Sequence, residues 1–122
     1  TGPVDFNLMM TYLSACDILW LPLSDIPANK GRFPLKFSNY LSSARPIIST
    51  DVGDIPEIIK KYNTGIVVED DPDSVVKSTN ILYDNVKLSE SLAKNAGDLS
   101  QKPEQSWRNR AIKLLRFYDE LR

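Results

Sequence analysis

The residues from Gly31 to Glu57 read GRFPLKFSNYLSSARPIISTDVGDIPE, and they decide how the chain folds. Pro34 stands where a helix begins, because proline is favoured at the first helical position, where no backbone N–H is needed. Beyond it, Phe37 and Leu41 recur at an interval of four, which is typical of the buried face of a helix. The pattern therefore predicts a helix over residues 34–43.

A strand and a second helix follow within the same stretch. Ala44-Arg45-Pro46 ends the first helix, and the apolar residues after it predict a short strand over 47–50. Asp51-Val52-Gly53 is a turn, and Asp54 stands where it could cap a helix over 55–62. A strand whose end leads directly into a helix N-terminus is where open α/β sheets bind ligands.

The rest of the chain repeats this alternation. The apolar run at 17–23 predicts a strand buried on both faces, as in a parallel sheet. Three alternations of strand and helix predict the α/β class, with a three-layer, Rossmann-like parallel sheet flanked by helices. Three strands are few for such a sheet, so we expect a partial one. The further expected elements are helices at 4–16, 73–83, 87–99 and from Ser106 or Glu104 onward, and a strand at 65–69.

The helical spacing also predicts which side chains face the core. In the first helix, Met9 and Cys16 fall on the predicted buried stripe, so we interpret them as core filling and an inert thiol. Trp107 lies on the apolar face of the last helix, and its position predicts core packing rather than stacking on a base or sugar. The remaining members of the first stripe are Leu8, Tyr12 and Leu13.

Composition excludes several classes of function. The chain has 122 residues, which suits a single domain over 1–122. Its net charge of −1 gives no reason to expect nucleic acid as a partner. Without histidine there is no histidine-based triad or metal site, and Cys16 alone cannot form an internal disulfide. The acidic run Glu69-Asp70-Asp71 has no ligand spacing, so we expect no metal.

An anion site is the chemistry that the central stretch favours. The amides of Leu35 and Lys36 fall in the first turn of the predicted helix, where they have no intrahelical partner. Unpaired amides and the helix dipole attract an anion, and Lys36 adds a full positive charge. Asn39 and Ser43 lie on the same side of the helix as Lys36, so their side chains can meet one object.

The same stretch resembles a known family. The C-terminal donor-binding domains of GT-B fold glycosyltransferases of family 4 (group 1) carry E-G-F-G-x-P-x-x-E-A-M-A-x-G-x-P-V-I-A-T-D-x-G-G-x-P-E, or the variant R-F-P-x-K-x-x-E-Y-M-A-x-G-K-P-V-V. This chain has RFPLKFSNYLSSARP at 32–46 and TDVGDIPE at 50–57. The resemblance extends through both flanks, from the helix and strand before it to TGIVV at 64–68, and weakens after Asp71.

The resemblance implies a substrate and a set of contacts. A nucleotide-diphosphate sugar is the implied donor, and its sugar would pass to an acceptor with retained anomeric configuration, without a cofactor or an essential metal. By the match, Arg32 and Lys36 would meet the diphosphate together with the amide of Leu35. Asn39 would meet the ribose, and the backbone around Gly31 and Phe33 would approach the sugar.

Two departures from the family pattern leave an alternative open. Gly31 stands where the family has its first glutamate, and Asn39 where it has the second. An asparagine still bonds a hydroxyl, but without the charge that strengthens such a bond. We assign no catalytic residue. The alternative function is a catalytically degenerate module that binds a nucleotide sugar or a protein partner. An unrelated α/β signalling domain is disfavoured because no acidic pair precedes Asp51 as a receiver domain would require.

The resemblance also places this chain within a larger protein. Thr1-Gly2-Pro3 begins without a methionine, so we expect a truncated C-terminal domain whose missing N-terminal domain binds the acceptor. The fragment alone should be inactive, since no cleft aligns donor and acceptor. An open sheet edge or the terminal helix could form a homodimer. We expect a cytoplasmic protein, or one held at a membrane by the missing part.

Overall fold

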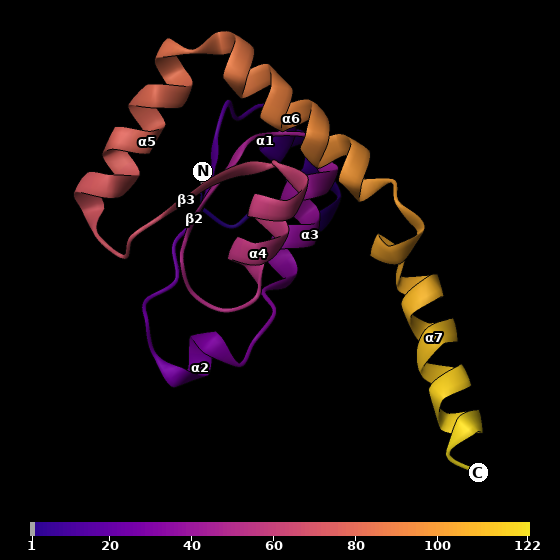
Figure 1. Cartoon of the computed structure of the whole chain (residues 1–122). Helices are drawn as coiled ribbons and strands as arrows, with labels where there is room; N and C mark the ends of the chain where they lie inside the picture. Colours follow the sequence, from indigo (N-terminus) through magenta and orange to yellow (C-terminus); the bar gives the residue numbers. More distant parts are fainter. Residues whose placement is uncertain (1) are drawn as a thin grey trace.

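The computed structural model describes residues 2–122, and its centre is a parallel sheet of three strands (Figure 1). The strands are β1 (Leu19–Leu21), β2 (Ile47–Thr50) and β3 (Gly65–Val68), in the order β1-β2-β3. In the register, Ile48 lies between Trp20 and Ile66. Parallel neighbours need a crossover, and helices supply both crossovers here. The α/β class predicted from the sequence is therefore confirmed.

Helices make up most of the remaining chain. A membrane-spanning helix is not among those formed by residues 2–122, since none is both long and apolar enough. Thr1 lies outside the described residues. The helices are α1 (Phe6–Ser14), α2 (Pro27–Lys30), α3 (Leu35–Ser42), α4 (Ile55–Tyr62), α5 (Pro72–Asp84), α6 (Val86–Ser100), the 3-10 turn η1 (Pro103–Gln105) and α7 (Trp107–Glu120).

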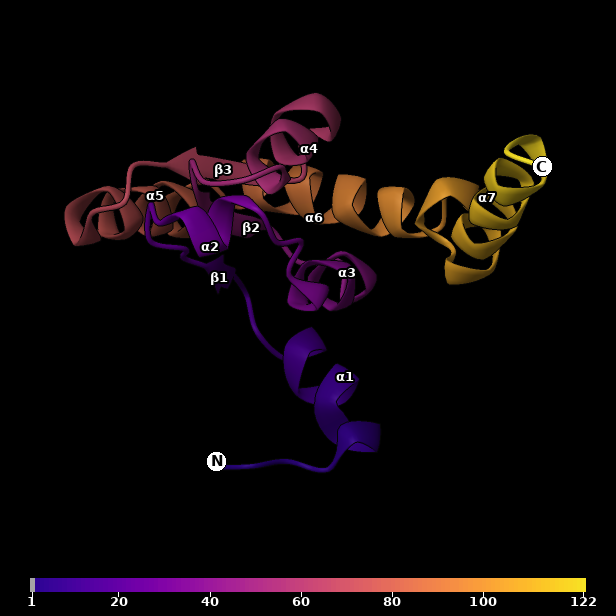
Figure 2. The ribbon, with the colours of Figure 1, turned by 90° about the horizontal axis from the view of Figure 1, so that it is seen from below.

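The core has one layer on each face of the sheet. On one face, α3, α4 and the second half of α6 pack against Leu21 and Ile47. On the other, α5 and the first half of α6 pack against Ile48 and Val68. The alternation follows from the strand period of two, which sends successive side chains to opposite faces. Because α6 contributes to both layers, it crosses one end of the sheet and joins them, as Figure 2 shows.

Most predicted boundaries hold to within one or two residues, and the differences have local causes. Pro34 is the N-cap of α3, with extended ψ of 122°, so the helix begins one residue later than predicted. The predicted strand at 17–23 shortens to β1, because Pro22 cannot donate to the ladder. The loop after it contains the short helix α2, which proline at its first position favours. Asp54 precedes α4, but its side chain makes no capping bond.

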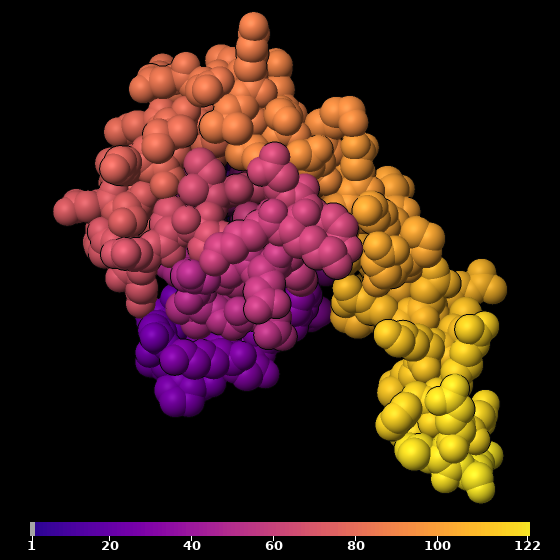
Figure 3. Space-filling model, viewed as in Figure 1, coloured from indigo at the N-terminus to yellow at the C-terminus, as the bar shows by residue number. Residues whose placement is uncertain are grey.

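The predicted burial of the two terminal helices is wrong. Neither α1 nor α7 has a buried residue, Cys16 is exposed, and Trp107 is 64% exposed. Figure 2 shows both helices standing away from the layers around the sheet, and Figure 3 shows the same for α7. Helical periodicity identifies an apolar face, but another element must cover that face before it is buried. The described chain supplies no element that does so.

Gly65 marks a close approach between β2 and β3. A Cβ atom built there would lie 1.8 Å from the Ile47 carbonyl oxygen, which is backbone and cannot rotate away. Ala44 marks a second constraint, since its φ is 51°, in the left-handed region that alanine resists. Across from it, a Cβ on Gly97 of α6 would lie 3.1 Å from the Ala44 Cβ.

Gly65→Ala should lower the free energy of unfolding by about 3 kcal/mol or more, because the added methyl must separate two paired strands. Urea denaturation measures the loss. Gly31→Ala is the matched control, since its Cβ would meet only the Pro27 carbonyl oxygen at 3.7 Å, an ordinary contact. That variant should stay within about 0.5 kcal/mol of the parent chain. Equal effects of the two substitutions would contradict this account of Gly65.

Ala44→Gly should raise the free energy of unfolding by about 0.5–1 kcal/mol, because relief of the left-handed strain exceeds the entropy cost of glycine. It should also make room opposite Gly97. Gly97→Ala would then gain the full helix-propensity benefit of about 1 kcal/mol only in the Ala44→Gly background. A double-mutant cycle by urea denaturation checks this coupling. Strictly additive effects would show that the two Cβ atoms do not compete for space.

Candidate donor site

The candidate site lies at the carboxyl edge of the sheet. Each strand here runs into a helix, so the N-termini of α3, α4 and α5 all begin on this side. Figure 1 shows the short helix α2 beyond the same edge. The ends of parallel strands and the starts of the following helices form the ligand-binding edge of open α/β sheets. The stretch from Gly31 to Glu57 supplies the start of α3 and the whole junction between β2 and α4.

A hollow of about 550 Å³ opens between the end of β1 and the start of α3. Four of the six predicted site residues line it, namely Arg32, Phe33, Leu35 and Lys36. The other lining residues come from β1 and the segment just after it, from the N-cap of α3, and from the helix itself: Trp20, Leu21, Pro22, Leu23, Pro34 and Tyr40. The fold therefore brings both predicted cations to one concave surface.

Gly31 and Asn39 do not line this hollow. Gly31 is the C-cap of α2, and its amide donates to the Pro27 carbonyl at 3.1 Å. Asn39 is half-buried beside α1, where its Nδ2 lies 3.9 Å from the sulfur of Met9. A thioether is a weak acceptor, so this contact holds the amide only loosely. These two positions are also the ones at which the sequence departs from the family pattern.

The first turn of α3 presents amides toward the edge of the sheet. Pro34, the N-cap, provides no side chain to accept from them. Phe37 N donates to the Pro34 carbonyl at 3.1 Å, while the amides of Leu35 and Lys36 precede the first intrahelical bond. The helix dipole adds about 0.3–1 kcal/mol of attraction for an anion at such a terminus. Lys36 and Arg32 bring full charges to the same place.

Positive charge in the hollow is not neutralised by the described chain. Lys36 and Arg32 are the charged residues among its lining, and no carboxylate lines it. Within residues 2–122, the ion pairs join Lys30 to Asp25, Lys60 to Asp51 and Lys94 to Asp98, so neither lining cation is paired. A concave surface with two unpaired cations attracts an anionic ligand.

The end of β1 is fixed by a bond pair that the sequence interpretation missed. Thr50 Oγ1 accepts from the amide of Leu23 at 2.8 Å and donates to the carbonyl of Leu23 at 2.7 Å. All of these groups are buried. Thr50 thus ties the strand end of β2 to the segment that lines the hollow. A polar β-branched residue at the last position of a strand was the available sequence signal.

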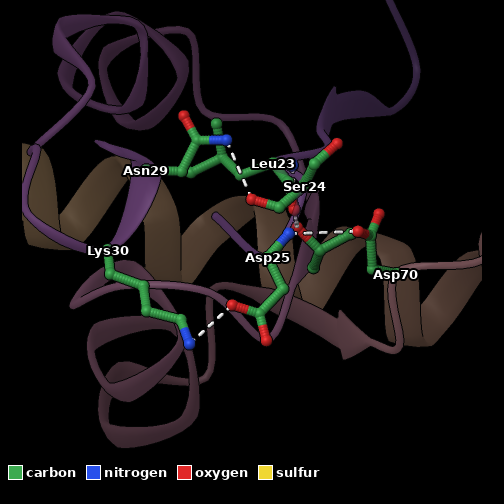
Figure 4. A network of polar contacts seen from close by, with 7 residues as sticks. Leu23, Ser24, Asp25, Asn29, Lys30 and Asp70 are labelled. Carbon is green, nitrogen blue, oxygen red and sulfur yellow. Dashed lines mark hydrogen bonds and ion pairs between the residues drawn. The ribbon is translucent and has the colours of Figure 1, made fainter. Parts of the chain in front are cut away.

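A polar network holds the loop after β1 against the loop after β3 (Figure 4). The amide of Asp25 donates to Asp70 Oδ2 at 3.2 Å, and the Asp25 carboxylate pairs with Lys30 at 2.6 Å. Asn29 Nδ2 donates to the Ser24 carbonyl at 2.8 Å, which closes the turn. The ion pair is exposed and contributes little alone. Together these contacts connect α2 and the loop before it to the loop after β3.

Tyr40 closes the inner wall of the hollow. Its hydroxyl donates to the Trp20 carbonyl at 3.3 Å, so it links α3 to β1. Burial raises the pKa of the Tyr40 hydroxyl, and the nearby Cys16 thiol raises it further. The hydroxyl therefore stays protonated and acts as a hydrogen-bond donor.

As for metals, residues 2–122 contain no group of three or more acidic, cysteine or histidine side chains arranged to hold one.

Comparison with known proteins identifies the class. Residues 1–85 match the model of the family described as glycosyl transferases, group 1. This match covers well over half of the 122 residues, and it includes the whole of the candidate site. The chain therefore belongs to the group 1 glycosyl transferases. The resemblance drawn from the residues at 31–57 is confirmed by this match.

The chain is similar to two known proteins. It is 31% identical over 72 residues to TuaH of Bacillus subtilis (strain 168), which is provisionally named a teichuronic acid biosynthesis glycosyltransferase. Those residues are 59% of this chain and 18% of TuaH. Sucrose-phosphate synthase from Thermosynechococcus elongatus superimposes with a TM-score of 0.83 and 20% identity, over 99% of this chain and 29% of the synthase. The fold is thus that of part of a GT-B glycosyltransferase.

Thr50→Val should lower the free energy of unfolding by about 2–4 kcal/mol, because it leaves the buried amide and carbonyl of Leu23 without partners. Thr50→Ser is the matched control. It keeps the hydroxyl and removes one methyl group, so about 1 kcal/mol should be lost. Thermal or urea unfolding of the two variants compares them. A valine variant as stable as the serine variant would rule out the bond pair as the anchor of β1.

Proposed function

We propose that this chain binds a nucleotide-diphosphate sugar at the hollow between β1 and α3, as the donor side of a glycosyltransferase. The supporting observation is the charge of the hollow. Arg32 and Lys36 line it without a carboxylate partner, beside the amides that open α3. A diphosphate carries negative charge and acceptor oxygens for all of these donors.

The walls of the hollow suit the remainder of a nucleotide sugar. Phe33 and Tyr40 bring aromatic side chains to its lining, and Leu35 adds an exposed apolar side chain. Aromatic faces stack on bases and sugars at modest cost in conformational entropy. In this arrangement the diphosphate lies at the start of α3, while base or sugar contacts the aromatic wall. Asn39 reaches the ribose if its contact with Met9 is exchanged for one with a hydroxyl.

Transfer then follows from stabilisation of the departing nucleotide. As the glycosidic bond to the diphosphate breaks, negative charge grows on the phosphate oxygen that leaves. Lys36, Arg32 and the α3 amides stabilise that charge, which lowers the barrier without a metal ion. The proposed reaction retains the anomeric configuration. We further propose that a second domain of a longer protein holds the acceptor; the chain spans 18% of TuaH and 29% of sucrose-phosphate synthase. We place that protein in the cytoplasm.

Titration calorimetry with UDP, GDP and ADP tests the donor site in the 122-residue chain. One nucleotide should bind, and Lys36→Ala should weaken it at least tenfold, because a charge-assisted bond is worth about 1.5–3 kcal/mol. Lys77→Ala is the matched control. It removes the same charge from an exposed position on α5, away from the hollow, and should change affinity less than twofold.

The outcome separates the two functions. Binding that is lost in the Lys36 variant and kept in the Lys77 variant supports the donor site, and the preferred nucleotide defines the base. Equal loss in both variants would mean that only the overall charge matters. If none of the three nucleotides binds, the proposal fails. The degenerate module that contacts a protein partner then becomes the better description, with Gly31 and Asn39 as the substitutions that removed the donor.

A further inference from the structure

The C-terminal helix contacts the candidate site through one side chain. The guanidinium carbon of Arg110 on α7 lies 5.9 Å from the centroid of the Phe33 ring. Phe33 lines the hollow, next to Arg32 and one residue before the N-cap of α3. The other polar and ring contacts of this part of α7 stay within residues 103–110, whereas this one reaches the segment before α3. Residues more than 70 positions apart in sequence thus meet at the rim of the site.

Arg110 is held firmly from its own side. Its Nε donates to the Glu104 carbonyl at 3.1 Å, and one terminal nitrogen donates to Gln105 Oε1 at 2.9 Å. The guanidinium also lies 5.5 Å from the ring of Trp107. These contacts with η1 and the start of α7 hold the guanidinium where its carbon lies near the Phe33 ring. A lysine ammonium could not make these contacts together.

Phe33 also contacts the hydrophobic core. Its ring packs edge-on against Phe37, with centroids 5.9 Å apart and planes at 82°. Phe37 is a fully buried residue of α3, whereas Phe33 is 37% exposed. The ring of Phe33 therefore contacts both a buried core residue and the Arg110 guanidinium. The backbone of Phe33 in turn positions Arg32 and the first turn of α3, which supply the donor contacts proposed above.

We propose that Arg110 is a positioning residue of the donor site: by stacking on Phe33, it holds the segment from Gly31 to Lys36 in its binding conformation. Arg110 itself does not line the hollow and touches no substrate. The effect of Arg110 on donor binding rests on the proposed function. Its effect on the conformation of residues 31–36 rests on geometry alone. It gives the start of α7 a role in the site, although the helix is otherwise exposed.

Amide hydrogen exchange in the unliganded 122-residue chain tests the positioning directly. The reporter is the Phe37 amide, which donates to Pro34 in the first turn of α3. In Arg110→Ala its exchange should become about two- to fivefold faster, as expected for loss of an exposed cation–π contact. Arg108→Ala is the matched control: it removes the same charge from an exposed side chain two residues earlier, and it should leave the Phe37 exchange rate unchanged. The Ile48 amide in β2 controls for global stability.

Two further variants distinguish the stack from charge. Arg110→Lys keeps the charge but cannot make the paired bonds to the Glu104 carbonyl and Gln105 that fix the guanidinium, so its exchange rate should be close to that of Arg110→Ala. In a Phe33→Leu background, Arg110→Ala should add nothing further. Exchange at Phe37 that is unchanged in Arg110→Ala, equally raised in Arg108→Ala, or restored by lysine would overturn the proposal. A matching rise at Ile48 would also overturn it, since the effect would then be general.

Nucleotide titration completes the test and separates it from the test of function. Where the parent chain binds a nucleotide, Arg110→Ala should weaken the affinity about two- to fivefold and Arg108→Ala should not. Faster Phe37 exchange in a chain that binds no nucleotide would leave the positioning intact and refute the donor site. Binding that depends on Lys36 but not on Arg110, with unchanged exchange, would support the donor site and refute the positioning role.

Discussion

The burial of β2 on both faces is the constraint on which the rest of the structure depends. All four residues of this strand are buried, and it pairs in parallel with a strand on each side. A parallel strand cannot reach its neighbour without a crossover, and each crossover here carries a helix to a face of the sheet. Those helices begin at the carboxyl edge of the sheet. The helices that bury β2 therefore also place their N-termini where the hollow forms.

The electrostatics of the hollow follow from this placement. The exposed amide terminus of α3 and the two cations repel one another, and the packing of α3 on the sheet through Phe37 and Leu41 offsets this repulsion. Burying two such side chains is worth several kcal/mol, about 1.5–3 for each. Core packing thus stabilises a surface whose charges remain available for a ligand. Membership of the group 1 glycosyl transferases gives that surface a chemical context.

The two terminal helices show the limits of the described chain as a structural unit. Both α1 and α7 are amphipathic in sequence, and both lack buried residues. The Arg110 stack nevertheless gives α7 a defined position at its first turns, where it reaches Phe33. A helix can therefore be tethered to a site by a few directed contacts while its apolar face stays open. The position of α7 is thus set by the contact between Arg110 and Phe33, and burial of its apolar face does not contribute.

The sequence by itself determined the class of fold, the position of most elements and the residues to consider at the site. Local patterns suffice for these, because periodicity, proline and the motif at 32–46 are written in neighbouring positions. Tertiary structure alone decided which of those residues meet. It brought Arg32 and Lys36 to one hollow, placed Asn39 against Met9, left Trp107 exposed, and set Thr50 and Arg110 beside distant partners. Burial and long-range bonds depend on what covers or faces a side chain, and no local pattern records that.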